Sequence, residues 1–195
     1  MRSIEGLLVD LSRAWRLAAR PTLQMIGCSA LLLRTDYDRG TKDGDVLETA
    51  TLDAASQAHL LALAGNGTEL ATRWRIYMEV VSNGLPFLPR VPRWHPIVID
   101  GMTDAFAVEA LDVVDVVVSK LKRFHIHDRA DVEAMIERDL VPHDALVERF
   151  RDAVDVFASD ARAEDLPTYV RHLHDVERDM LLVDESDIEL PPWIE

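Results

Sequence analysis

The sequence predicts an α+β fold in which a small mixed sheet flanked by helices is followed by a helical C-terminal half. Three observations lead to this prediction. A short apolar run, a small-residue turn and a helical run follow one another between residues 22 and 34. Residues 75–81 alternate between polar and apolar, as a half-buried strand does. From residue 112 to residue 182 the apolar residues recur at helical spacing.

The N-terminal half is expected to mix helices and strands. An amphipathic helix comes first and stops before Pro21, because proline cannot continue a helix. A strand then leads through Gly27 into a second helix. Asp53 is expected to cap a third helix, since an aspartate at this position accepts a hydrogen bond from a first-turn N–H group. The expected helices and strands cover residues 4–19, 22–26, 29–34 and 75–81.

The C-terminal half is expected to be helical. A long Pro-rich connection, residues 82–96, precedes it and is expected to pack on the sheet edge through Phe87 and Trp94. The alternative is that its aromatic residues and arginines contact a base or an acceptor. We expect a nucleotidyltransferase-like α/β domain at residues 1–138 and a helical extension with an acidic tail at residues 139–195. The expected helices cover residues 112–124, 129–138, 143–158 and 166–182.

Asp43 and Asp45 stand one residue apart in the segment that follows Gly27. In an extended chain their side chains point to the same face, because strand side chains alternate. Two carboxylates about 4 Å apart repel by roughly 4 kcal/mol at an effective dielectric constant of about 20, so the pair favours a bound cation. An Asp-Gly-Asp sequence is also typical of a solvated turn, and this motif alone leaves both interpretations open.

The same stretch resembles the nucleotidyltransferase superfamily, and within it the small bacterial families grouped with AbiEii-type toxins and minimal nucleotidyltransferases. The shared pattern is an apolar residue, Gly, a small residue, a spacer and Asp-x-Asp, often preceded by Arg-x-Thr. Here Cys28 and Gly44 depart from the usual residues. The resemblance implies a nucleoside triphosphate as substrate and Mg²⁺ or Mn²⁺ as cofactor. It also implies nucleotide contacts from Gly27, Cys28, Ser29, Arg39, Thr41 and Lys120.

A second stretch resembles the later part of the same pattern. Lys120-Leu121 is followed by Asp128-Arg129-Ala130-Asp131, and in similar proteins such residues lie on consecutive helices that close over the nucleotide. The resemblance covers roughly residues 20–136 and implies catalytic roles for Asp43, Asp45, Lys120 and Asp131. From the residues alone, Lys120 also fits an ordinary surface lysine, and Asp128 fits a helix cap.

Physical chemistry assigns similar roles without the resemblance. Nucleotidyl transfer relies on positioning and charge stabilisation, so its site needs carboxylates for a metal, a cation near the phosphates and backbone donors. Asp43 and Asp45 are the metal candidates, and Lys120 is the cation that would meet the phosphates. Glu79 is the candidate third metal ligand, because strand alternation places it opposite the apolar face of its segment. An exposed strand carboxylate explains Glu79 equally well.

The histidines offer a different interpretation. His125 and His127 precede Asp128, and imidazole and carboxylate groups together bind transition metals. However, these histidines fall between two expected helices, where polar residues are common, and no HExxH helix or cysteine cluster accompanies them. The sequence therefore favours the carboxylate site over a zinc site.

The composition restricts the partners and the compartment. The 195 residues carry a formal charge of −14, so broad attraction to a long nucleic acid is not expected, and a nucleoside triphosphate fits better. The single cysteine excludes an internal disulfide and indicates a reducing, cytoplasmic compartment. No apolar run reaches the roughly 20 residues of a membrane span, so no membrane contact is expected.

Two classes of function follow. The first is a metal-dependent transferase that moves a nucleotide from a nucleoside triphosphate to an RNA such as tRNA, a protein or a small molecule. One role within this class is the toxin of a toxin-antitoxin or phage-defence pair, with an antitoxin as partner. The second class is a non-catalytic interaction module with the same fold. The apolar stripe of residues 166–182 is expected either to pack within the chain or to form a homo-oligomer or partner surface.

Overall fold

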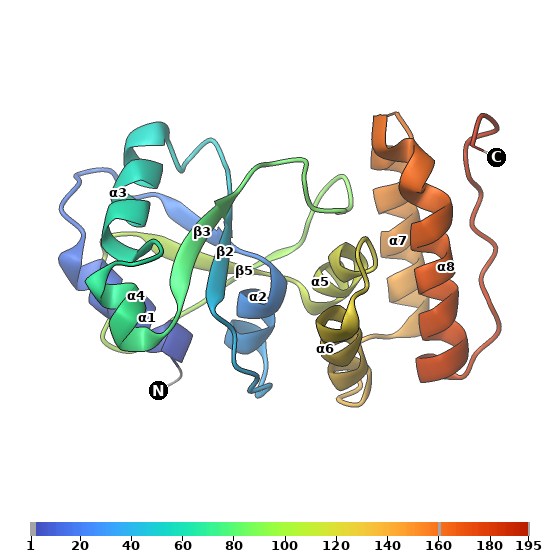
Figure 1. Cartoon of the computed structure of the whole chain (residues 1–195), viewed down its shortest axis with the longest axis horizontal. Helices are drawn as coiled ribbons and strands as arrows, with labels where there is room; N and C mark the ends of the chain where they lie inside the picture. The colour runs from blue at the N-terminus through green and yellow to red at the C-terminus, as the bar shows by residue number, and fades with distance from the viewer. Residues whose placement is uncertain (1–2, 160, 195) are drawn as a thin grey trace. The chain divides into compact units, whose positions relative to one another are not determined.

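The computed structural model describes residues 3–159 and 161–194, and Figure 1 shows the chain as a mixture of strands and helices. The predicted α+β class is confirmed, with helices throughout the C-terminal half. No helix among the described residues is both long enough and apolar enough to cross a membrane. The elements are α1 (Ser3–Ala14), β1 (Thr22–Met25), α2 (Gly27–Arg34), β2 (Asp43–Leu47), α3 (Ala54–Ala64), α4 (Glu69–Trp74), β3 (Tyr77–Val81), β4 (Trp94–Pro96), β5 (Ala107–Leu111), α5 (Val113–Lys120), α6 (Ile126–Ile136), α7 (His143–Phe157), the 3₁₀ helix η1 (Ala161–Asp165), α8 (Leu166–Val176) and the π-helical turn η2 (Glu177–Leu181).

The chain divides into two compact units. The first contains the chain up to Leu85 together with Trp94–Asp112, and it holds the whole sheet. The second contains Pro86–Arg93 together with the chain from Val113 onward, and it is helical. Helices α5 and α6 therefore group with the later helices by their contacts. A domain boundary at residue 138 stays a prediction.

The sheet of the first unit is mixed, with the strand order β3-β2-β1-β5-β4. β1 runs parallel to β5 and antiparallel to β2, and β2 runs parallel to β3. On one face of the sheet, Ile4 of α1 lies close to Gly44 and Met78. Because strand side chains alternate, the side chains of Asp43 and Asp45 point to the opposite face.

Helix α1 ends at Ala14, earlier than the sequence predicts. The N–H group of Arg16 donates to Nε2 of His59 at 3.2 Å, and the Trp15 ring packs edge-on against the rings of His59 and Phe106. These contacts with distant parts of the chain take the backbone out of the helix. Pro21 sets only the furthest point that the helix could have reached, not the residue at which it ends.

The predicted cap of α3 is confirmed. Asp53 stands at the N-cap, and its Oδ1 accepts a hydrogen bond from the backbone N–H of Ser56 at 2.8 Å. This backbone hydrogen bond holds the pKa of the Asp53 carboxyl below its ordinary value. The local signal was sufficient here because an N-cap depends only on residues within one helical turn.

Phe87 packs inside the helical unit, so its predicted packing on the sheet edge is wrong. Its side chain is fully buried, and its ring meets those of Phe150 and Tyr169 edge-on at centroid distances of 5.3 and 5.1 Å. Trp94 begins β4, the edge strand of the sheet. The Pro-rich connection is thus divided between the two units.

The apolar stripe of α8 is buried within the second unit. Leu166, Tyr169, Leu173 and Val176 are each at most 3% exposed. Packing within the chain therefore accounts for these residues. A homo-oligomer or partner interface at this helix stays a prediction.

Candidate metal centre

Three carboxylates meet on one face of the β2–β3 pair. The parallel register places Asp43 opposite Tyr77 and Asp45 opposite Glu79, so all four side chains share a face. Asp43, Asp45 and Glu79, hereafter the acidic cluster, each offer a carboxylate oxygen within 4.8 Å of the others. Among the residues that the structure describes, this is the only group of three or more His, Cys, Asp and Glu residues close enough to hold a metal ion.

The donor set of the acidic cluster fits a hard divalent cation. All three ligand candidates are oxygen donors, which Mg²⁺ and Mn²⁺ prefer, whereas zinc and copper sites use nitrogen and sulfur donors more often. Asp43 and Asp45 are half-buried and Glu79 is exposed, so solvent reaches the cluster. Without a cation, the three negative charges would repel one another across this short separation.

Thr41 orients one of these carboxylates. Its hydroxyl donates to Oδ1 of Asp43 at 2.7 Å, and the same Oγ1 lies 3.1 Å from the Asp43 carbonyl oxygen. The nucleotide contact that the resemblance implies for Thr41 stays a prediction, and in the structure the hydroxyl binds Asp43. Arg39, the other residue of that part of the pattern, is half-buried in the segment before β2.

Gly27 brings the start of α2 against the acidic cluster. Its φ of +60° is a left-handed conformation, and a Cβ atom there would lie 2.8 Å from Oδ2 of Asp45. The N–H of Ile26 also donates to the Asp45 carbonyl oxygen at 3.0 Å. The first N–H groups of a helix have no acceptor within the helix, and the helix dipole adds partial positive charge there. The start of α2 therefore presents backbone donors beside the carboxylates.

The side chains of this turn do not face outward as phosphate ligands. The Ser29 hydroxyl donates to the carbonyl oxygen of Ile26 at 2.8 Å and is buried, and Cys28 is buried as well. Nucleotide contacts from Cys28 and Ser29 stay a prediction. Cys28 is an acceptable replacement for a smaller residue because its side chain packs in the apolar interior.

The departure at Gly44 also has a structural explanation. A Cβ atom there would lie 2.8 Å from Sδ of Met78 and 3.3 Å from Cδ1 of Ile4. The apolar space that a larger residue would fill is thus occupied by Met78 and Ile4. β2 remains anchored without an apolar side chain at this position.

Tyr77 belongs to the site, although the sequence interpretation did not include it. Its partner in the register is Asp43, and the negative charge of Glu79 is the main cause that holds the pKa of its phenol above the ordinary value. Burial and the charges of Asp43 and Asp45 act in the same direction. The sequence could have indicated Tyr77, because it stands two residues before Glu79 in the same predicted strand and therefore shares its face.

Lys120 and Asp131 lie together in the second unit. Nζ of Lys120 is 2.7 Å from Oδ2 of Asp131 and 3.0 Å from Oδ1 of Asp128, and all three residues are buried. Asp128 is not the cap of α6, because His125 occupies that position and the Asp128 carboxylate binds Lys120. The structure thus brings together one pair of predicted catalytic residues in each unit: Asp43 with Asp45, and Lys120 with Asp131.

The histidines form no metal-binding group within the described ranges 3–159 and 161–194. His125 and His127 are exposed around the start of α6. Nδ1 of His172 lies 2.6 Å from the Leu121 carbonyl oxygen, and Nε2 of His143 lies 2.8 Å from Oε1 of Glu177. Hydrogen bonding within the helical unit therefore accounts for His143 and His172.

One family model matches most of the chain. A family model described as a nucleotidyltransferase of unknown function (DUF6036) matches residues 9–181, which include the acidic cluster as well as Lys120 and Asp131. No curated protein and no solved structure matches the chain significantly. The match extends over most of the sequence and over both compact units. The chain therefore belongs to the DUF6036 family of nucleotidyltransferases of unknown function.

Proposed function

We propose that the chain is a metal-dependent nucleotidyltransferase whose active site is the acidic cluster. The observation that carries this proposal is the convergence of three carboxylates from adjacent strands beside the start of a helix. Asp43, Asp45 and Glu79 would hold Mg²⁺ or Mn²⁺. The bound ion would supply positive charge that the triphosphate and the transition state need.

The chain itself supplies the positioning. Thr41 holds the Asp43 carboxylate through its hydroxyl, and the first N–H groups of α2 are suited to bind phosphate oxygens. In the transfer, an acceptor hydroxyl attacks the α-phosphorus, pyrophosphate leaves, and the hydroxyl proton passes to a carboxylate.

Lys120 and Asp131 are proposed to contact the nucleotide, as the resemblance implies. Lys120 would meet the phosphates, and Asp131 would hold the ammonium in place through their 2.7 Å ion pair. RNA, including tRNA, protein and small molecules are the proposed acceptor classes. A toxin of the AbiEii type, with a cognate antitoxin, is the proposed biological role.

A labelled-nucleotide transfer screen tests this function. The purified chain is incubated with each of the four nucleoside triphosphates, labelled at the α-phosphate, with Mg²⁺ or Mn²⁺ and with tRNA, protein or small-molecule acceptors. We expect metal-dependent labelling of one acceptor class. The double variant Asp43→Asn plus Asp45→Asn should lose it, because the amides no longer carry the charge that holds the cation.

Asp38→Asn is the matched control, because Asp38 is an exposed aspartate in the segment that leads into β2. This variant should label its acceptor at the wild-type rate. The second candidate, a non-catalytic module, predicts metal-dependent nucleotide binding without transfer to any acceptor. Unchanged metal-dependent binding in the double variant would show that the acidic cluster is not the metal site.

A further inference from the structure

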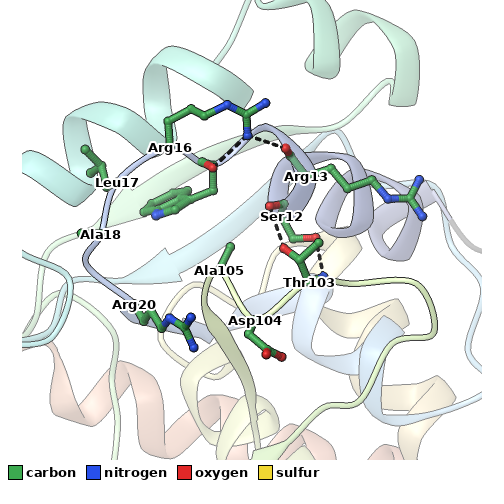
Figure 2. A pocket seen from close by; sticks show the side chains of 10 residues that line it. Ser12, Arg13, Arg16, Leu17, Ala18, Arg20, Thr103, Asp104 and Ala105 are labelled. Carbon is green, nitrogen blue, oxygen red and sulfur yellow. Dashed lines mark hydrogen bonds between the residues drawn. The ribbon is translucent and has the colours of Figure 1, made fainter.

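A pocket of about 540 Å³ lies in the first unit, where the chain leaves α1 and turns toward β1 (Figure 2). Its walls come from the end of α1, the connection to β1 and the segment before β5. Arg20 precedes β1, whereas Gly27 and the acidic cluster lie at the other end of that strand. Seven residues of extended chain separate the two places by roughly 20 Å.

Three arginines line this pocket, hereafter the arginine pocket, in a chain whose formal charge is −14. They are Arg13, Arg16 and Arg20, and Asp104 is the only acidic residue in the lining. Figure 2 shows Arg16 and Arg20 on opposite sides of the pocket, with Ala105 between them.

Contacts within the chain explain two of these arginines: Arg16 caps the end of α1, and Arg13 bonds a loop carbonyl and lies 4.0 Å from Oδ1 of Asp10. Nη1 of Arg16 donates to the carbonyl oxygens of Arg13 and Trp15 at 2.7 and 3.0 Å, and Nη2 of Arg13 donates to the Gly101 carbonyl oxygen at 3.2 Å. Cations suit the negative end of a helix, where α1 ends. These bonds fix the two guanidinium groups, and each group has five N–H donors in all.

Helix capping does not explain Arg20. This exposed residue lies beyond the helix end, and within the described part of the chain its guanidinium makes no hydrogen bond or ion pair. Asp104 lines the same pocket without pairing to it. Arg20 therefore brings a full set of donors to a pocket whose lining also includes Arg13 and Arg16.

The pocket wall is held by a pair of hydrogen bonds between distant segments. The N–H of Thr103 donates to Oγ of Ser12 at 3.1 Å, and the Thr103 hydroxyl donates to the Ser12 carbonyl oxygen at 2.9 Å (Figure 2). A wall held in this way lowers the entropy cost of binding, because less has to be ordered when a ligand arrives.

We propose that the arginine pocket binds a phosphate group, at a site separate from the acidic cluster. The guanidinium fork matches the oxygens of a phosphate and can bind two of them at once. Apolar lining from Trp15, Leu17 and Ala105 suits a phosphate that is carried on an organic ligand. The source is either a small phosphorylated molecule or the terminal phosphate of a nucleic-acid acceptor.

Calorimetric titration of the whole chain with inorganic pyrophosphate tests this site. Chelator is present, so that no divalent metal can hold the probe at the acidic cluster. We expect the wild type to bind, Arg20→Ala to bind at least tenfold more weakly, and Arg20→Lys to lie between them because it keeps the charge but loses the fork. Arg20→Ala should melt at the wild-type temperature, since its side chain makes no described contact.

Two controls separate binding in the arginine pocket from binding at any surface arginine and from binding at the acidic cluster. Arg171→Ala removes an exposed arginine of α8 and should leave the affinity unchanged. Asp43→Asn plus Asp45→Asn should also bind pyrophosphate as the wild type does, whether or not the proposed enzymatic function is correct. No binding by the wild type, equal binding by Arg20→Ala, or a loss in the aspartate variant would each overturn the proposal.

A competition experiment then distinguishes the two sources of the phosphate. Short ribo-oligonucleotides that differ only in a 5′-phosphate or a 5′-hydroxyl compete against pyrophosphate for the wild type and for Arg20→Ala. Competition by the 5′-phosphate form alone, lost in Arg20→Ala, assigns the pocket to a nucleic-acid end. Pyrophosphate binding without competition from either form assigns it to small phosphorylated molecules.

Discussion

Gly27 is the residue whose substitution should affect the acidic cluster most directly. Its φ of +60° costs an L-residue about 1–2 kcal/mol, and an added Cβ would also lie 2.8 Å from Oδ2 of Asp45. Gly27→Ala should therefore lower the free energy of unfolding by about 1–2 kcal/mol and weaken Mn²⁺ binding, because Asp45 has to move. Urea unfolding and Mn²⁺ titration measure the two effects.

Gly40→Ala is the matched control, because nothing lies within 4 Å of the Cβ position at Gly40. We expect it to leave both the stability and the Mn²⁺ affinity near the wild-type values. If Gly27→Ala bound Mn²⁺ as tightly as Gly40→Ala, the close approach of the turn to Asp45 would have no importance for the site.

Lys120 has a structural role besides the proposed phosphate contact. Its ammonium is buried between Asp128 and Asp131, and removing one partner of a buried ion pair commonly costs about 3–5 kcal/mol. Lys120→Met should destabilise the chain to this extent in urea unfolding, because two buried carboxylates lose their counter-charge. Lys42→Met, which changes an exposed lysine, should have little effect. Equal stability of the two variants would contradict the buried ion pair.

At the scale of elements, the π-helical turn η2 ties the C-terminal tail to α7. Oε1 of Glu177 lies 2.8 Å from Nε2 of His143, and Oε2 accepts from the N–H of Ser186 at 3.0 Å. Burial alone raises the pKa of the Glu177 carboxyl, but the hydrogen bonds from Ser186 and His143 outweigh burial and leave the pKa below its ordinary value of 4.5. The ionised form of Glu177 therefore stabilises the fold.

This depressed pKa predicts a dependence of stability on pH. Because the pKa is lower in the folded state, the contribution of Glu177 is fully present above pH 4.5 and is lost as the pH falls through the folded-state pKa. Urea unfolding across this range should show a smaller acid-induced loss in Glu177→Gln than in the wild type. Glu189→Gln, at an exposed glutamate of the tail, should keep the wild-type pH dependence.

At the scale of the whole molecule, the charge of −14 makes cations stabilising in general, so a specific metal effect has to exceed that of salt. Mg²⁺ should raise the melting temperature of the wild type more than NaCl at the same ionic strength, because a ligand that binds only the folded state stabilises it. Thermal unfolding of the wild type and of Asp43→Asn plus Asp45→Asn measures the difference.

The double aspartate variant has a definite expected behaviour in that experiment. Its melting temperature without metal should equal or exceed that of the wild type, because removing two charges relieves repulsion within the acidic cluster. Mg²⁺ and NaCl should then act on it equally. If Mg²⁺ raised the melting temperature of the variant more than NaCl did, the responsible metal site would lie outside the acidic cluster.

Local patterns predicted much of the candidate site. The alternation of strand side chains predicted which face Asp43, Asp45 and Glu79 would occupy, and the strand-turn-helix order around Gly27 predicted α2, although the helix begins at Gly27 and not at residue 29. Such features depend on neighbours within a few residues. Gly27 also lies so close to Asp45 that a Cβ atom would not fit, and this constraint between distant residues is not visible in any local pattern.

The sequence by itself determined the α+β class, the acidic pair, the Asp53 cap and the periodicity of the helices, because these depend on short-range backbone geometry. Only the tertiary structure decided that Glu79 pairs with Asp45, that Phe87 belongs to the helical unit and that Asp128 binds Lys120 rather than capping a helix. The physical reason is that strand register, aromatic packing and buried ion pairs join residues far apart in the chain. Their partners are selected by the burial and charge balance of the folded molecule.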